Sequence, residues 1–269
     1  MSAPDLSRAA ALIAESFREE GFTRNTLDLS TPAQQARFTE AVELRLLLSR
    51  ARGEEFVVAT IGETLVGIAI VKPPAPEALP WYRQAGIVLR RVPRLLGLLK
   101  DAYLGRIVQF IPTAKLSVPL PQPYYTLDVL AVAPDHQGQG IARQLVEHVH
   151  AQCDEDEQAS GCYLLTGDEK NTQIYRRFGY RVVEAKQGGP VTAWHMFRPH
   201  PARDAEALFA ALREAAPATS PARWRKLALP ILGMVGALLG LALLWRRLHS
   251  REPLMGLQWR FWRRATSRN

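Results

Sequence analysis

Cysteine is scarce in this chain, and the two that occur form neither a metal-binding nor a disulfide pattern. Cys153 and Cys162 are the only cysteines among 269 residues, with no second pair and no histidine cluster beside them. A disulfide framework and a zinc site therefore both lack support. We expect two reduced thiols in a cytosolic domain and no metal.

Signals for export and for common nucleotide-binding folds are missing as well. Residues 1–20 contain acidic side chains and no uninterrupted apolar stretch, so they do not predict a signal peptide. Arg143 stands where a dinucleotide-binding fingerprint needs its third glycine, and the motif G-x-x-x-x-G-K-[ST] is absent. We therefore expect a domain that faces the cytoplasm.

Positive charge is concentrated in two segments. The chain has a formal charge of +8, yet residues 246–269 alone contain seven arginines against one glutamate, and residues 81–120 contain seven arginines and lysines against Asp101. The rest of the chain is mildly acidic. Because no nucleic-acid-binding module is recognisable, we expect membrane lipid, and not nucleic acid, to be the partner of both basic segments.

The periodicity of apolar residues predicts an α/β (α+β) fold, in which helices flank a mixed central sheet. Helices are expected at 4–20, where Gly21 is a natural stop, and at 32–52, where Thr31 is the cap. Two short amphipathic helices are expected within 81–115, an insertion broken by Pro93 and Pro112. Further helices are expected at 141–153, 171–178 and 202–214, and strands at 55–60, 64–71, 124–133, 162–166, 181–185 and 191–197.

An apolar run near the C-terminus predicts a membrane segment. Residues 227–245 carry no charge, and 19 residues of helix reach about 28 Å, close to the roughly 30 Å hydrocarbon core of a bilayer. Pro230 and the glycines of the run leave a bent re-entrant segment open as an alternative to a C-terminal anchor that spans the membrane. Gly236 and Gly240 form a G-x-x-x-G pair that offers a homodimer face.

A glycine-rich turn joins a predicted strand to a predicted helix at residues 134–141. The segment reads VLAVAPDHQGQGIARQLVEH, and the first turn of the helix contains no acidic side chain. Backbone N–H groups at such a turn point outward and suit a pyrophosphate, and glycines at 138 and 140 allow a ligand to approach closely. We therefore expect an anion-binding loop here.

This loop resembles the acetyl-CoA signature of the GNAT (GCN5-related N-acetyltransferase) superfamily, [Q/R]-x-x-G-x-[G/A]. The resemblance implies that the main chain near Val132 holds the pantetheine arm where two strands splay apart, and that amides of residues 137–143 hold the pyrophosphate. It also makes acetyl-CoA the acyl donor. The implied cofactor-binding residues are Val132, Gln137, Gly138, Gln139, Gly140, Ile141, Ala142, Arg143 and Asn171.

A second block strengthens the resemblance. The segment NTQIYRRFGY, which begins at Asn171, looks like the family's N-x-x-x-x-Y-x-x-x-G-[FY]. In the family this tyrosine, here Tyr175, is the general acid that protonates the departing CoA thiolate. With the segment 190–196, the pattern is similar to the subgroup of puromycin-type N-acetyltransferases, although Leu165 stands where that subgroup often has a glutamate.

Asp128 is the candidate for the second catalytic residue. It lies on the strand four residues before Val132, where several relatives place a carboxylate that removes a proton from the amine. A salt-bridged strand carboxylate is the alternative. His136, His148 and His150 are expected on the surface.

These patterns predict an acetyltransferase domain over residues 1–200 with a basic helical insertion at 81–120. A helix and linker at 201–226, the apolar segment 227–245 and a basic tail at 246–269 follow. The predicted activity is transfer of an acetyl group to a primary amine by direct attack on the thioester, with the acceptor unknown. A catalytically degenerate, membrane-anchored acyl-CoA-binding or scaffold protein is the alternative.

Overall fold

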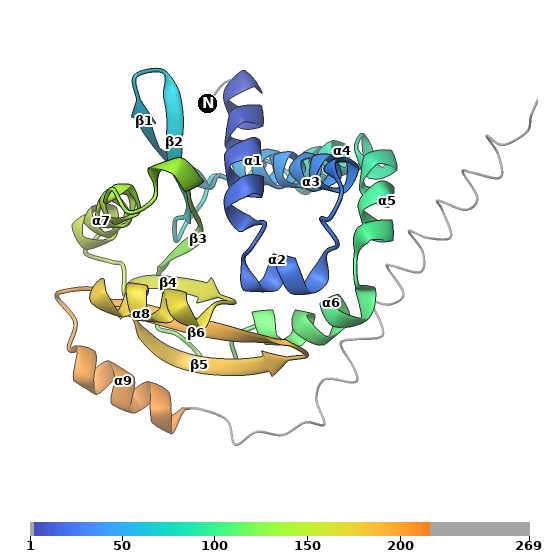
Figure 1. The fold of residues 1–269 in the computed structure, drawn as a ribbon. Coiled ribbons are helices and arrows are strands. Elements are labelled where there is room, and N and C mark those ends of the chain that lie inside the picture. Colours follow the sequence, from blue (N-terminus) through green and yellow to red (C-terminus); the bar gives the residue numbers. More distant parts are fainter. Residues whose placement is uncertain (1–2, 216–269) are drawn as a thin grey trace, which may run out of the picture. The chain divides into compact units, whose positions relative to one another are not determined.

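A computed structural model describes residues 3–215, which form a six-stranded sheet flanked by helices (Figure 1). The strands are β1 (Glu55–Ile61), β2 (Thr64–Lys72), β3 (Tyr125–Val132), β4 (Gly161–Thr166), β5 (Arg181–Gly188) and β6 (Val191–Pro199), in the spatial order β1-β2-β3-β4-β6-β5. Only β3 and β4 run parallel. The mixed sheet and all six predicted strands are confirmed, with ends displaced by up to three residues.

Two groups of helices cover the two faces of the β1–β3 half. On one face, α1 (Ala3–Phe17) and α3 (Pro32–Ala51) pack on Ile68 and Ile70 of β2. On the other face, α7 (Ile141–Glu155) packs on Val66 and Val71 of the same strand. Because β2 is buried on both faces, its sequence is almost continuously apolar instead of alternating.

Two further helices, α8 (Glu169–Arg177) and α9 (Ala205–Glu214), lie at the β4–β6 half. Helix α8 follows β4, and α9 packs its Phe209 and Leu212 beside Phe197 of β6. The predicted cap Thr31 is present at the start of α3, where its Oγ1 accepts from the Gln34 N–H at 3.3 Å as part of a capping box.

One predicted helix boundary was wrong. Gly21 does not end the chain's helical start but begins a separate short helix, α2 (Gly21–Thr26). The Glu20 carboxylate caps it by accepting from the N–H groups of Phe22 at 2.9 Å and Thr23 at 3.1 Å. A capping carboxylate therefore restarts the helix where glycine alone predicts a stop.

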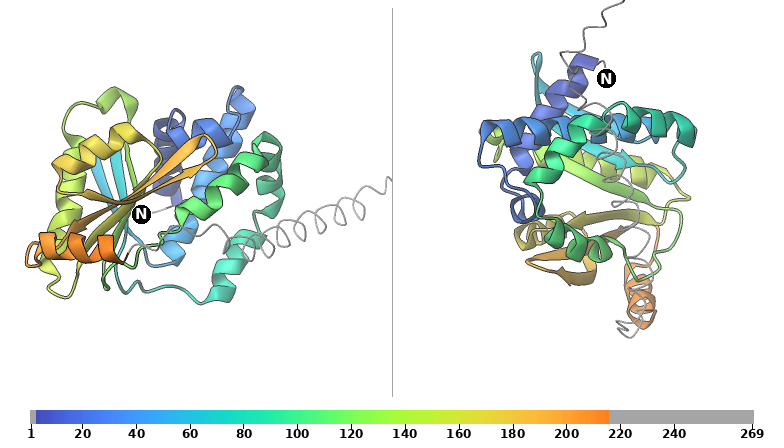
Figure 2. Two further views of the ribbon diagram at one scale, coloured as in Figure 1. Left: turned by 90° about the horizontal axis from the view of Figure 1, so that it is seen from below. Right: turned by 90° about the vertical axis from the view of Figure 1, so that its right-hand side faces the viewer.

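The basic insertion contains one more helix than predicted. It forms α4 (Trp81–Leu89), α5 (Val92–Asp101), α6 (Leu104–Phe110) and a short 3-10 turn at Ile111–Ala114. Pro93 stands in the first turn of α5, where a missing N–H costs nothing, and so it starts a helix instead of breaking one. The three helices follow one another along one side of the molecule and face the viewer in the right-hand view of Figure 2.

The membrane prediction concerns residues that the structure does not describe. Within residues 3–215, no helix is both long enough and apolar enough to cross a membrane. The apolar run at 227–245, its G-x-x-x-G pair and the basic tail lie outside the described residues, so the anchor remains a prediction from the sequence.

Candidate active site

The central sheet opens between its two parallel strands. Pairing between β3 and β4 covers only Tyr125 to Leu127, whereas β3 stays paired with β2 as far as Val132. A cleft of about 890 Å³ occupies the gap and continues over α1, α2 and α8. The predicted splay near Val132 is therefore present, and it places unpaired backbone along one wall of a cavity.

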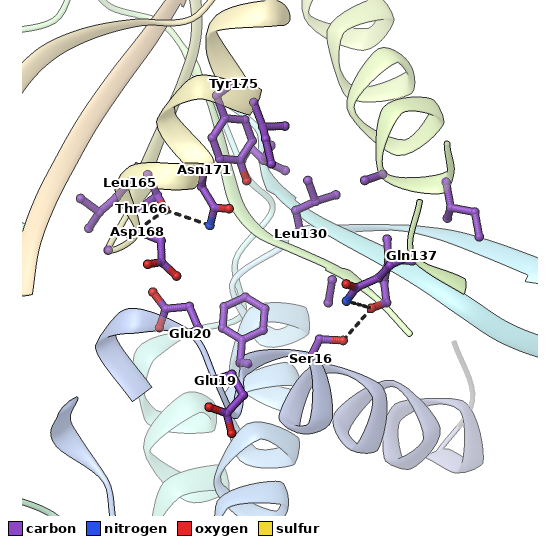
Figure 3. A pocket seen from close by; sticks show the side chains of 18 of the residues that line it. Ser16, Glu19, Glu20, Leu130, Gln137, Leu165, Thr166, Asp168, Asn171 and Tyr175 are labelled. Carbon is purple, nitrogen blue, oxygen red and sulfur yellow. Dashed lines mark hydrogen bonds between the residues drawn. The ribbon is translucent and has the colours of Figure 1, made fainter. Parts of the chain in front are cut away.

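The register of β3 decides which of its backbone groups face this cleft. The Ala133 N–H donates to the Val66 carbonyl at 2.9 Å, so alternate residues of β3 direct their backbone groups toward β2. Leu130 and Val132 therefore direct theirs toward the cleft. The Val132 carbonyl accepts from Ser16 Oγ at 2.9 Å and from Gln137 Nε2 at 3.2 Å (Figure 3).

The glycine-rich loop forms one end of the cleft. Gly138 and Gly140 have φ of +74° and +82°, and a Cβ at either position would meet no atom within 4 Å, so the space above the loop is open. Gly140 begins the 15-residue helix α7 without a side-chain cap. The first N–H groups of α7, at residues 141–143, and its dipole thus point to an open space suited to an anion.

Nearly all of the predicted cofactor-binding residues line this cleft. The exception is Gln139, whose side-chain amide donates to the Asp135 carbonyl at 3.4 Å. Gln137 uses its side chain to hold β3, as described above, instead of pointing into open space. Those that line the cleft are Val132, Gln137, Gly138, Gly140, Ile141, Ala142, Arg143 and Asn171.

Tyr175 and Asn171 reach the cleft from α8. Figure 3 shows the Tyr175 hydroxyl directed toward Leu130 of β3. Burial raises the pKa of Tyr175 to about 12, so the phenol keeps its proton at neutral pH. The Asn171 amide donates to Thr166 Oγ1 at 3.3 Å, which fixes its orientation at the cleft wall.

Asp128, the base predicted from the sequence, lies on the cleft wall but is engaged elsewhere. Its carboxylate forms an ion pair with Arg45 of α3, and Arg45 also lies 3.6 Å from Glu54. A guanidinium partner favours the ionised carboxylate and so weakens it as a base. The salt-bridged arrangement that the sequence left open is the one observed.

The end of the cleft opposite the glycine loop carries two carboxylates that the sequence did not reveal. Glu20 and Asp168 face each other there (Figure 3). Burial raises the pKa of Glu20, and repulsion from Asp168 adds to the effect. Asp168 in turn accepts from the Gly21 N–H at 3.3 Å, so the α1–α2 junction and the start of α8 are joined at this point.

Aromatic rings close the same end. Phe22 of α2 and Phe110 of α6 both line the cleft, with ring centroids 4.4 Å apart. The insertion therefore contributes directly to the wall of the cavity. Leu165, which stands at a frequent glutamate position of the puromycin-type subgroup, also lines it and brings no charge.

The histidine predictions were partly wrong. His150 is buried, not on the surface, and its ring lies 3.1 Å from the Tyr180 hydroxyl. Burial lowers the pKa of His150 to about 4, so it is neutral and structural. No group of histidine, cysteine and carboxylate side chains within residues 3–215 is arranged to hold a metal ion.

Comparison with known proteins finds a family model that matches part of this site. Residues 101–182 match the model described as acetyltransferase (GNAT) domain, which spans the glycine loop, Asn171 and Tyr175. This part of the chain is similar to a GNAT acetyltransferase domain, and the donor used by that family is acetyl-CoA, as the loop motif predicted. No curated protein matches the chain.

Two solved structures of acetyltransferases align with most of the chain. A histone acetyltransferase HPA2-related acetyltransferase from Corynebacterium glutamicum aligns with a TM-score of 0.54 at 19% identity, over 76% of this chain and 96% of that one. A PaiA N-acetyltransferase from Thermoplasma acidophilum in complex with coenzyme A gives 0.46 at 13%, over 74% and 96%. The first of these shows the GNAT fold. None of these comparisons singles out the puromycin-type subgroup.

Proposed function

We propose that this GNAT domain is an N-acetyltransferase that moves the acetyl group of acetyl-CoA to a primary amine by direct attack on the thioester. One observation carries the proposal. A single cleft runs from an anion-binding helix start, past unpaired backbone of β3 and the Tyr175 hydroxyl, to the carboxylates of Glu20 and Asp168. This arrangement supports separate positions for the donor, the reaction centre and the acceptor.

The donor end suits a pyrophosphate with a long amide-bearing arm. The N–H groups at the start of α7 bind the phosphates, and the cleft-facing groups of Leu130 and Val132 lie where the arm enters the sheet. Ser16 and Gln137 hold the Val132 carbonyl and so keep β3 in place. This donor-binding arrangement does not depend on the resemblance to puromycin-type N-acetyltransferases.

The reaction needs a group that polarises the thioester carbonyl, an acid for the departing thiolate and a base for the amine. The amine nitrogen attacks the thioester carbon while the Leu130 N–H polarises the carbonyl oxygen. The carbon–sulfur bond then breaks, and Tyr175 gives its proton to the departing thiolate and regains one from solvent. Tyr175 is suited to this step because its raised pKa of about 12 keeps the proton in place until the thiolate forms.

Glu20 is the better proton acceptor of the two carboxylate candidates. Asp128 is neutralised by Arg45, whereas burial and the neighbouring Asp168 raise the pKa of Glu20. A carboxylate with a raised pKa is the stronger base when ionised. We therefore assign to Glu20 the proton that leaves the amine, and we retain Asp128 as the alternative given by the sequence.

The acceptor end favours an amine with an apolar body. Carboxylates attract an ammonium group before it loses its proton, and the rings of Phe22 and Phe110 offer a surface for aliphatic or aromatic carbon. Neutral alcohols would gain nothing from the charged pair. This combination supports amines over hydroxyl acceptors.

We also propose that the domain faces the cytoplasm and is held at a membrane by residues 227–245. The support is the uncharged run of the sequence at residues 227–245. The proposed use of acetyl-CoA favours a catalytic domain in the cytoplasm. The G-x-x-x-G homodimer face is a prediction of the same kind.

The test is release of CoA thiol by the full chain in the presence of acetyl-CoA and a panel of primary amines, each paired with its isosteric alcohol. We expect thiol release with amines that carry an apolar body and none with the matched alcohols. Binding of acetyl-CoA without turnover on any amine would favour the alternative, a degenerate acyl-CoA-binding or scaffold protein.

A further inference from the structure

The outer face of the insertion is unusually apolar for a surface that touches water. On α4, Trp81 is 79% exposed, Leu89 70% and Tyr82 57%. Leu89 follows Trp81 by eight residues, which places it about 80° around the helix and next to Tyr82. These three side chains thus form one exposed apolar strip along α4.

A second apolar edge lies on α6. Leu104 and Val108 are each 41% exposed, and Ile111 just beyond the helix is 37% exposed. Their spacing of four and three residues puts them on one side of the helix. Phe110, between them in sequence, lines the cleft instead, so α6 separates the cleft from the outer face.

The solvent-facing charge of the insertion itself has one sign. Residues 81–120 contain a single acidic side chain, Asp101, which is buried and paired with Arg37 through Nε to Oδ2 at 2.6 Å. No acid of the insertion is therefore left to face solvent. Among the side chains of the insertion that the structure describes, the exposed basic ones are Arg83, Arg90, Lys100, Arg106 and Lys115.

Ion pairs and hydrogen bonds join the insertion to the rest of the domain, so its exposed apolar side chains belong to a packed part of the structure. Besides the Arg37–Asp101 pair, Arg91 contacts Glu43 of α3 at 3.3 Å. The Tyr103 N–H donates to the Thr26 carbonyl, and the Asp28 N–H donates to the Asp101 carbonyl, both at 2.8 Å. These bonds hold the apolar strips outward.

We propose that the outer face of α4–α6 docks onto a bilayer that contains anionic lipid. Tryptophan and tyrosine settle at the level of the headgroups, leucine and valine enter the boundary of the acyl chains, and arginine and lysine pair with anionic headgroups. The lack of solvent-facing acids within the insertion suits an anionic surface better than a protein partner of mixed charge. The apolar run at 227–245 makes the same lipid surface available to this face.

The experiment places a reporter on this face in the full chain. Cys153 and Cys162 are fully buried, so a polarity-sensitive fluorophore attaches selectively to a cysteine introduced by Leu89→Cys. The matched control is Ile61→Cys on β1, another exposed apolar position, at 53%. Both proteins are bound to phosphatidylglycerol-containing vesicles and, separately, to pure phosphatidylcholine vesicles.

We expect a blue shift of the Leu89→Cys label, and its quenching by brominated lipid, on the anionic vesicles only. The Ile61→Cys label should report water on both. Because a tail anchor would bring both labels to the vesicle, a difference between them measures docking and not attachment. Equal, water-like signals from the two positions on anionic vesicles would overturn the proposal.

Charge is tested by Arg83→Gln with Arg90→Gln, against the control pair Arg203→Gln with Arg213→Gln near α9. Each arginine near an anionic surface contributes about 1 kcal/mol, so the first pair should weaken docking of the label by roughly 30-fold and the control pair should leave docking unchanged.

A blue shift without vesicles that grows with protein concentration would instead show that a second copy covers this face. Protection of the label by RNA and not by lipid would equally refute lipid docking.

Discussion

The two ends of the cleft differ in where their chemistry comes from. The donor end is built from consecutive backbone groups of one strand, one loop and one helix, within residues 130–143. The acceptor end is built from side chains of three separate segments, the α1–α2 junction, α6 and the start of α8. The backbone end serves a donor that never changes, whereas side chains can be exchanged to suit a different acceptor without disturbing it.

Glu20→Gln should cause the largest loss of activity and should affect the acceptor end alone. Glu20→Gln keeps an oxygen that can cap α2 but removes the base, so kcat/KM for the amine should fall by roughly 10²–10⁴-fold with acetyl-CoA affinity unchanged. Only ionised Glu20 accepts a proton. Because its pKa is raised, wild-type activity should fall with decreasing pH at a higher pH than for an ordinary glutamate.

A pH profile of kcat/KM checks this assignment. The acidic limb should be present in the wild type and absent from the residual activity of Glu20→Gln. Asp128→Asn is the matched comparison, and it should cost less, because Arg45 already neutralises that carboxylate. A greater loss in Asp128→Asn would return the role of base to Asp128.

Tyr175→Phe tests the reaction centre between the two ends. Loss of a general acid should lower kcat by about 100-fold, and removal of a single hydroxyl should change acetyl-CoA affinity by less than about threefold. Steady-state kinetics together with equilibrium binding separates the two quantities. A normal kcat would remove Tyr175 from the chemistry and make it a packed aromatic residue that contacts Tyr180.

Phe110→Ala tests whether the acceptor end can be altered without changing the donor end. Loss of its ring should raise KM for an amine with an apolar body by about tenfold and leave acetyl-CoA binding intact. Val108→Ala, two residues away on the outer side of α6 and 41% exposed, is the control and should change neither. Equal effects of the two variants would mean that α6 acts through its stability and not through the cleft.

The smallest expected effect lies at the donor end. Ser16→Ala removes a hydroxyl whose single proton is shared between the Leu12 carbonyl at 2.8 Å and the Val132 carbonyl at 2.9 Å. Acetyl-CoA affinity should therefore fall by at most about fivefold, the equivalent of about 1 kcal/mol. Thr39→Ala removes a hydroxyl that bonds only within its own helix, at 3.1 Å to the Gln35 carbonyl. Calorimetric titration of the two variants compares them, and an unchanged affinity in Ser16→Ala would show that Gln137 alone positions β3.

The same contrast explains what the sequence predicted. The glycine loop, Asn171 and Tyr175 lie in two short continuous motifs, and the sheet strands are short apolar runs bounded by turns, so local patterns were sufficient for both. Leu130 was not singled out, although its position two residues before Val132 on the same strand is a signal that alternation supplies.

The acceptor end had no such local signal. Glu20 and Asp168 are 148 positions apart, and each resembles an ordinary surface carboxylate until the fold brings them together. For Glu20 the clue was a carboxylate directly before Gly21, in a position to cap a new helix. The ion pair of Asp128 also had no local signal, since its partner Arg45 comes from a distant helix.

The most direct test that this cleft binds acetyl-CoA is calorimetric titration of acetyl-CoA into the full chain. Val replaces both Gly138 and Gly140 in one variant and Gly62 in the control, which has a φ of +59° and equally open space at the tip of the β1–β2 hairpin. We predict wild-type binding on the order of micromolar, retained in the control and weakened by about 100-fold or more in the double variant. Absence of binding by the folded wild type would contradict the assignment of this cleft to acetyl-CoA.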